Sequence, residues 1–117
     1  MGAAEKVAIK ILEKRKIVEV ADVERVSREI LILKRVGDVH ENVIRLYEVI
    51  DTPKAIYLIM EYCNGGELFT VLHTRDRDGV PATSAKFYCG CCVLALAYLL
   101  ERSIIYRDLK PENMLVD

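Results

Sequence analysis

The sequence predicts an α+β fold. Three segments in its first half are rich in β-branched residues and alternate as strands do, and two longer segments have the spacing or the composition of helices. The chain has 117 residues, of which 52% are hydrophobic and 30% charged, with a net charge of -1. This balance is typical of a globular domain rather than a disordered chain, and the length allows one small domain. Periodicity predicts these elements but not how they assemble.

The first strand and the first helix are predicted near the N-terminus. The segment Val7 to Leu12 alternates and is predicted as a strand. A charged linker, Glu13 to Glu19, separates it from a helix in which Asp22 is expected to be the N-cap. Apolar residues then follow helical spacing as far as Val36, and Gly37-Asp38 is expected to end the helix.

Two further strands and a turn follow this helix. Val43 to Ile50 and Ala55 to Met60 are predicted as strands, joined by a turn through Asp51-Thr52-Pro53-Lys54. Asn64-Gly65-Gly66 is predicted as a turn because glycine accepts positive φ. Glu67 to Leu72 is predicted as a short helix.

The second half begins with a charged loop, His73 to Val80, and continues with a long helix. Pro81 is well suited to open this helix, which is predicted to run to about Arg102. Its middle is apolar on all sides, as is typical of a helix buried within a domain. Ile104 to Tyr106 is expected to be a short strand.

Charge and hydropathy exclude several classes of protein. With 17 basic and 18 acidic residues there is no basic excess, so we expect no nucleic-acid partner. The N-terminus has no apolar leader segment, and the longest apolar run, Phe87 to Leu100, is too short to span a bilayer as a helix. We therefore expect a cytoplasmic or nuclear protein with no membrane partner.

The four cysteines, Cys63, Cys89, Cys91 and Cys92, do not have the spacing of a zinc site, and no histidine is close to the last three in sequence. We expect buried, reduced thiols that pack as small hydrophobic side chains, with Cys63 more exposed than the others.

Two charged residues fall where apolar residues are expected. Lys10 lies in the middle of the first strand, between Ala8 and Leu12, and Glu29 borders the apolar stripe of the first helix. One interpretation is a lysine that reaches water at the sheet edge and an acid on the helix flank. The other is an ion pair between the two, because burying either charge alone would be costly.

The most informative stretch runs from Tyr106 to Asn113. It places an acid, a cation and an amide (Asp108, Lys110 and Asn113) within six residues, and Pro111 keeps the segment from continuing a helix. Such a set can hold a hydroxyl, a transferring phosphoryl group and a metal ion together. The alternative is a polar turn before a strand, for which the eight residues are too specific.

This stretch resembles the catalytic loop of protein kinases, with Tyr106 in place of the usual histidine and with Lys110 as in the Ser/Thr kinases. Val-Ala-Ile-Lys, ending at Lys10, together with Glu29, resembles the lysine and the helix-C glutamate of that family. Residues 56–69 resemble the kinase hinge.

The resemblance covers 7–117 and implies an incomplete protein-kinase-like fold and, by descent, an ATP-dependent protein Ser/Thr kinase. The first half is similar to the calcium/calmodulin-dependent group and the second to the cyclic-nucleotide-dependent group.

The resemblance also implies roles for the polar residues. Asp108 would orient the substrate hydroxyl and accept its proton, Lys110 would neutralise charge on the γ-phosphoryl group, and Asn113 would ligate Mg2+. Lys10 would hold the α- and β-phosphates of ATP and would pair with Glu29. Arg107 pairs with a phosphorylated residue of the activation loop in this family, and Glu112 meets a basic residue of the peptide substrate in related kinases.

A second group of residues would bind the nucleotide. Ala8 and Leu115 would enclose the adenine ring, with Leu68 below it, and Met60 would limit the depth of the pocket. Backbone groups of Glu61 and Cys63 would face the adenine edge. Glu67 would accept hydrogen bonds from the ribose hydroxyls.

Two parts of the kinase pattern are absent from these 117 residues. No Gly-x-Gly-x-x-Gly loop precedes Val7, and no Asp-Phe-Gly follows Asn113. The resemblance therefore implies a partial kinase domain, with 1–62 as part of the N-lobe and 63–117 as the start of the C-lobe. We expect these residues alone not to catalyse phosphoryl transfer.

The alternative function is a truncated, non-catalytic interaction module. In either case we expect an exposed apolar face on the helix at 82–102, between Cys89 and Leu100. The rest of the C-lobe or a partner chain would cover that face.

Overall fold

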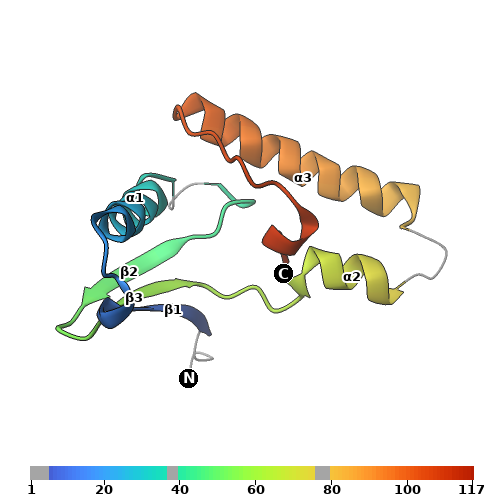
Figure 1. Cartoon of the computed structure of the whole chain (residues 1–117). Helices are drawn as coiled ribbons and strands as arrows, with labels where there is room; N and C mark the ends of the chain where they lie inside the picture. The colour runs from blue at the N-terminus through green and yellow to red at the C-terminus, as the bar shows by residue number, and fades with distance from the viewer. Residues whose placement is uncertain (1–5, 37–39, 76–79) are drawn as a thin grey trace, which may run out of the picture. The chain divides into compact units, whose positions relative to one another are not determined.

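The computed structural model describes residues 6–36, 40–75 and 80–117. They form an α+β fold, which confirms the predicted class, in two compact units, Met1–Tyr62 and Cys63–Asp117 (Figure 1). The elements in chain order are β1 (Val7–Glu13), the 3-10 turn η1 (Lys14–Lys16), α1 (Val20–Val36), β2 (Leu46–Asp51), β3 (Ala55–Glu61), β4 (Gly66–Glu67), α2 (Leu68–Arg75), α3 (Ala82–Glu101), the 3-10 turn η2 (Pro111–Asn113) and β5 (Leu115–Val116).

An antiparallel sheet of three strands, in the order β1-β3-β2, forms the described part of the first unit together with α1 (Figure 1). Leu58 of the central strand lies opposite Lys10 of β1 and Val49 of β2, and it is fully buried. Residues directly opposite each other in a sheet share a face. The ion pair from Lys10 to Glu29 of α1 places this helix over the same face, where Val26 of α1 is also buried.

The start of α1 differs from the prediction. The helix begins at Val20, so the prediction that Asp22 is the N-cap is wrong. Asp22 lies in the first turn, where its carboxylate accepts a hydrogen bond from the Glu19 backbone N–H at 3.4 Å and pairs with Arg25 at 2.8 Å. An acid in the first turn is stabilised by the helix dipole. The predicted end of this helix, Gly37-Asp38, lies outside the described residues.

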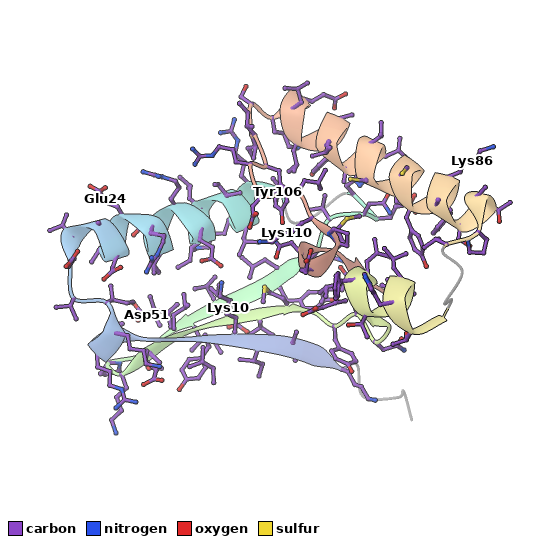
Figure 2. The ribbon with its side chains drawn as sticks, turned by 45° about the vertical axis from the view of Figure 1, so that its right-hand side comes forward. Lys10, Glu24, Asp51, Lys86, Tyr106 and Lys110 are labelled. Atoms are coloured by element: carbon purple, nitrogen blue, oxygen red, sulfur yellow. The ribbon has the colours of Figure 1, made fainter. Side chains whose placement is uncertain are left out.

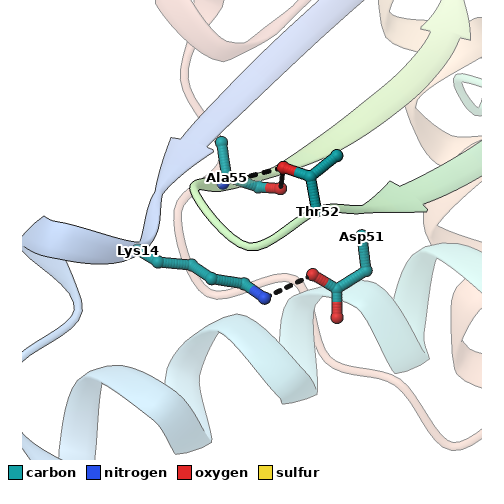
Figure 3. A network of polar contacts seen from close by, with 4 residues as sticks. All are labelled: Lys14, Asp51, Thr52 and Ala55. Carbon is teal, nitrogen blue, oxygen red and sulfur yellow. Dashed lines mark hydrogen bonds and ion pairs between the residues drawn. The ribbon is translucent and has the colours of Figure 1, made fainter.

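The turn between β2 and β3 is confirmed, and side chains stabilise it (Figure 3). The Thr52 hydroxyl donates to the Ala55 carbonyl at 2.8 Å and accepts from the Ala55 N–H at 3.1 Å. Lys14 pairs with Asp51 at 2.5 Å, and its backbone N–H donates to the Lys54 carbonyl at 2.9 Å. These bonds attach the segment after β1 to the turn.

The predicted second strand begins later than expected, because Val43 lies in a bend and Ile44 and Arg45 have no regular structure. β2 begins at Leu46 rather than at Val43. His40 causes the difference, because its carbonyl accepts from the Val43 N–H at 3.0 Å and its Nδ1 from the Asn42 N–H at 3.1 Å. A bulge between Leu46 and Glu48 also disturbs the start of the strand.

In the second unit, β4 and β5 form a short antiparallel ladder. Glu67, predicted as the first residue of a short helix, belongs to β4, and α2 runs from Leu68 to Arg75. Most of the charged loop predicted after it, residues 76–79, lies outside the described residues. The strand predicted at Ile104 to Tyr106 is wrong, because within the described part of the chain these residues pair with no strand.

The long helix is confirmed as α3, but its predicted burial is wrong. Of its residues only Tyr98 is buried, whereas the apolar side chains of Phe87, Val93, Leu94 and Leu100 are 55% to 69% exposed. The exposed apolar face expected between Cys89 and Leu100 is thus confirmed.

The cysteines and the length of α3 also differ from the predictions. Cys89 is exposed and Cys91 and Cys92 are half-buried, so the prediction of buried thiols is wrong for these three, and Cys63 is half-buried as well.

By length and composition alone α3 is sufficient to cross a membrane, contrary to the prediction from its apolar run, but a core helix of a soluble protein passes the same test.

A residue with positive φ follows the end of α3. Ser103 has φ of 59°, its N–H donates to the Leu100 carbonyl at 2.8 Å, and the Ile104 N–H donates to the Leu99 carbonyl at 2.9 Å. This is a Schellman arrangement, in which the left-handed position usually holds glycine.

Replacing Ser103 with glycine is expected to raise the free energy of unfolding by about 0.5–1 kcal/mol, because glycine adopts this φ without steric cost. The midpoint of urea unfolding, at an unchanged slope, measures the effect. The same substitution at Ser84, inside α3, is expected to lower stability by a similar amount. A Ser103→Gly chain no more stable than the wild type would contradict the prediction.

Candidate active site

The predicted catalytic residues of the second unit form one hydrogen-bonded cluster. Asn113 Nδ2 donates to the carboxylate of Asp108 at 2.8 Å and to the Asp108 backbone carbonyl at 3.0 Å. Lys110 Nζ lies 3.3 Å from the other carboxylate oxygen of Asp108. The acid is therefore held between an amide and an ammonium group, while 69% of its side chain remains exposed and accessible to a substrate.

The proline of this segment explains how the loop returns on itself. Lys110 has extended backbone angles, and Pro111 is the first residue of η2, a position that suits its fixed φ. The Asn113 N–H donates to the Lys110 carbonyl at 2.9 Å, and the Met114 N–H to the Pro111 carbonyl at 3.3 Å. This tight turn brings the Asn113 amide back to Asp108.

The segment after η2 is fixed to the start of α2. The Gly65 N–H donates to the Val116 carbonyl at 2.7 Å, and the Leu68 N–H to the Met114 carbonyl at 2.8 Å. Across the ladder Glu67 lies opposite Leu115. The residues predicted to bind the ribose and the adenine ring are thus neighbours, and both are exposed.

The predicted ion pair of the first unit is present. Lys10 Nζ donates to Glu29 Oε1, and the two side chains are 46% and 35% exposed. In Figure 2, Lys10 lies on the side of the sheet that α1 covers. Of the two interpretations of Lys10 and Glu29, the structure supports the pair, although both groups keep contact with water.

Two further predicted residues lie close to Lys10. Ala8 lies directly opposite Met60 in the β1–β3 ladder, and Met60 also lies opposite Leu46 of β2. Because side chains alternate along a strand, Ala8, Lys10 and Met60 share one face of the sheet. The next residue, Glu61, ends β3, and its carboxylate accepts from the Arg45 N–H at 3.1 Å.

The predicted site residues are divided between the two units. Ala8, Lys10, Glu29, Met60 and Glu61 belong to the first unit, and Cys63, Glu67, Asp108, Lys110, Asn113 and Leu115 to the second.

Sequence reasoning missed one residue of the site. An added Cβ at Gly65 would lie 2.5 Å from the Val116 carbonyl oxygen, so Gly65 permits the close approach of β5. Positive φ, the reason for which glycines were predicted in this turn, is found at Gly66, whose φ is 77°.

The family model for the protein kinase domain matches residues 2–117. The chain belongs to the protein kinase family. It is 43% identical over 113 residues to maternal embryonic leucine zipper kinase of Xenopus laevis, covering 97% of this chain and 16% of the relative. It is 41% identical over 117 residues to putative CBL-interacting protein kinase 13 of Oryza sativa subsp. japonica, covering 100% of this chain and 22% of the relative. The kinase chain thus spans less than a quarter of the length of either relative.

Family membership confirms the expected protein-kinase-like fold and the expected descent from Ser/Thr protein kinases. The cluster around Asp108 in this kinase chain combines a carboxylate with an ammonium group and an amide.

Asn113 is the residue predicted to ligate Mg2+. Among the described residues, no three His, Cys, Asp or Glu side chains lie together as metal ligands would. Asn113 turns its amide nitrogen to Asp108, which leaves the amide oxygen for a cation, and Mg2+ prefers oxygen ligands.

Proposed function

We propose that the complete protein transfers the γ-phosphoryl group of ATP to a Ser or Thr hydroxyl of a protein substrate. The observation that carries this proposal is the Asp108 carboxylate, held between the Asn113 amide at 2.8 Å and the Lys110 ammonium at 3.3 Å. We infer that the 117 residues supply the proton acceptor and part of the nucleotide site, and that they are inactive alone.

In the proposed reaction Asp108 orients the substrate hydroxyl and accepts its proton as the oxygen attacks the γ-phosphorus. Lys110 neutralises charge on the transferring group while the bond to the leaving ADP breaks. Asn113 would hold Mg2+ through its amide oxygen, and the bound ion would supply further charge neutralisation on the phosphates. Glu112 is exposed and would favour a basic residue in the peptide.

Each unit is proposed to carry residues that bind the nucleotide. Ala8 and Leu115 would pack against adenine, Met60 would bound the pocket, and backbone groups of Glu61 and Cys63 would bind the adenine edge. Glu67 would bind the ribose. The support lies in the pairing of Ala8 with Met60 and of Glu67 with Leu115 in their respective sheets.

The test is phosphorylation of a Ser- or Thr-containing peptide with basic flanking residues by the complete protein, using ATP labelled at the γ-phosphate. We expect Mg2+-dependent labelling of the peptide and none of a matched peptide with alanine at the acceptor position. Absence of labelling above that background would overturn the proposal.

Replacing Lys10 with methionine is expected to weaken ATP binding about tenfold, because a charged contact to phosphate is lost while the apolar stem is kept. The change should cost little stability, since its ion pair with Glu29 is partly exposed. A calorimetric titration of the complete protein with ATP measures the effect. The matched control is Lys14→Met, which removes a lysine of η1 that is paired with Asp51. Equal affinities of the two variants would contradict the role of Lys10.

A non-catalytic interaction module is the second candidate function, favoured by the exposed apolar side chains of α3. It requires a stable complex through this helix. A chain that sediments as a monomer and captures no partner would count against it.

A further inference from the structure

We propose that Glu61 is a positioning residue whose carboxylate takes the amide hydrogen of Arg45 and so keeps the Glu61 backbone carbonyl free for the 6-amino group of adenine. The inference rests on the proposed nucleotide site and adds a role for a side chain where that proposal uses only the backbone.

The hydrogen bonds at the end of the β2–β3 ladder carry the inference. The Glu61 N–H donates to the Arg45 carbonyl at 2.9 Å, as in a regular antiparallel pair. The Arg45 N–H donates instead to Oε2 of the Glu61 side chain, at 3.1 Å. In a regular hydrogen-bonded pair the two residues exchange both backbone bonds, so the acceptor would be the Glu61 carbonyl. The carboxylate therefore stands in for the carbonyl of its own residue.

Two features explain why the carboxylate is the preferred acceptor. A hydrogen bond to a charged oxygen is stronger than one to a neutral carbonyl. The bulge between Leu46 and Glu48 disturbs the ladder next to Arg45. The Arg45–Glu61 pair therefore does not have to form both backbone hydrogen bonds of a regular pair. Glu61 is only half-buried.

The consequence concerns the Glu61 carbonyl. The N–H and C=O of one strand residue point to the same side, so this carbonyl points toward the β2 side, at a position before the first residue of β2. A backbone acceptor without its ladder donor is available to an external donor. The exocyclic amine of adenine is such a donor, and Met60, the preceding residue, shares the face of Ala8.

The first arm of the test follows the Arg45 amide by hydrogen exchange and NMR in the 117-residue chain. Glu61→Ala removes the acceptor, so the Arg45 amide is expected to change its chemical shift and its exchange rate. Glu61→Gln keeps an oxygen at the same place and should restore the wild-type behaviour. Glu48→Ala, which removes an exposed carboxylate from the neighbouring strand, is the matched control and should leave Arg45 unchanged.

The second arm compares binding of ATP with binding of the analogue that has hydrogen in place of the 6-amino group, by titration of the complete protein. The wild type is expected to bind ATP about threefold to tenfold more tightly, the worth of one hydrogen bond. In Glu61→Ala the freed Arg45 N–H competes for the carbonyl, so the ratio should fall toward one. Glu61→Gln should keep the wild-type ratio, and thermal unfolding of each variant shows whether it is folded.

The outcomes separate this inference from the proposed function. An unchanged Arg45 amide in Glu61→Ala, or an unchanged preference for ATP, overturns the role of Glu61. Equal wild-type affinity for both triphosphates overturns this inference alone, whereas binding of neither overturns the proposed nucleotide site as well.

Discussion

Replacing Asp108 with asparagine is expected to lower kcat for phosphoryl transfer by the complete protein by about 10²–10⁴-fold, the usual contribution of a general base. Asparagine has nearly the same shape and can still accept the Asn113 hydrogen bond through its amide oxygen. It cannot take the proton of the substrate hydroxyl, and it removes the negative charge that lies 3.3 Å from Lys110.

Steady-state kinetics of the complete protein checks this prediction. The KM for ATP should change far less than kcat, because Asp108 is assigned to the acceptor hydroxyl rather than to the nucleotide. Glu101→Gln is a suitable control, since it neutralises an acid that is 76% exposed at the end of α3. If Asp108→Asn and Glu101→Gln had the same kcat, Asp108 would not be the base.

Replacing Gly65 with alanine is expected to lower the free energy of unfolding by about 1–3 kcal/mol, the usual cost of overpacking. The new methyl group would lie 2.5 Å from the Val116 carbonyl oxygen and 2.9 Å from its carbon. These are backbone atoms, which cannot rotate away as a side chain would. The Gly65–Val116 hydrogen bond at 2.7 Å must therefore lengthen, and β5 must separate from β4.

Gly90→Ala is the matched control for this prediction. Gly90 lies within α3. Apart from its chain neighbours and the nearby backbone of the helix itself, no described atom lies within 4 Å of the added methyl group. Alanine there is expected to stabilise the chain by about 0.5–1 kcal/mol through helix propensity. Urea unfolding of both variants gives the comparison. Equal stability of the two would mean that the approach of β5 to Gly65 is not required by the fold.

Local sequence patterns predicted those strands and helices well whose formation depends mainly on their own residues. The alternation around Lys10 and the spacing up to Val36 both produced the expected element. The strand expected at Ile104 to Tyr106 failed because β-branched composition does not supply a partner strand. The burial of α3 failed for a related reason. Composition shows what a helix is able to bury, not what packs against it.

The residues of the candidate site were predictable where they lie close together in one motif, or where a charged residue occupies a position that the local pattern assigns to an apolar one. Asp108 and Asn113 belong to one motif, and Lys10 was noticed as a charge on an apolar face. The bond from Arg45 to the Glu61 side chain joins residues far apart in the sequence, and neither is unusual in its own segment. Only the folded ladder shows that the carboxylate has replaced a carbonyl.

The short ladder between β4 and β5 has a consequence for the order in which the chain folds. Its two residue pairs join segments separated by about fifty residues, so closing that loop costs entropy before any contact is gained. The helix α3 lies inside the loop and needs only local contacts, which form much faster. We therefore expect the segment that carries Asp108 to take its place late in folding and to open early in unfolding. A protease cutting near Asn113 would report this opening while α3 is still helical.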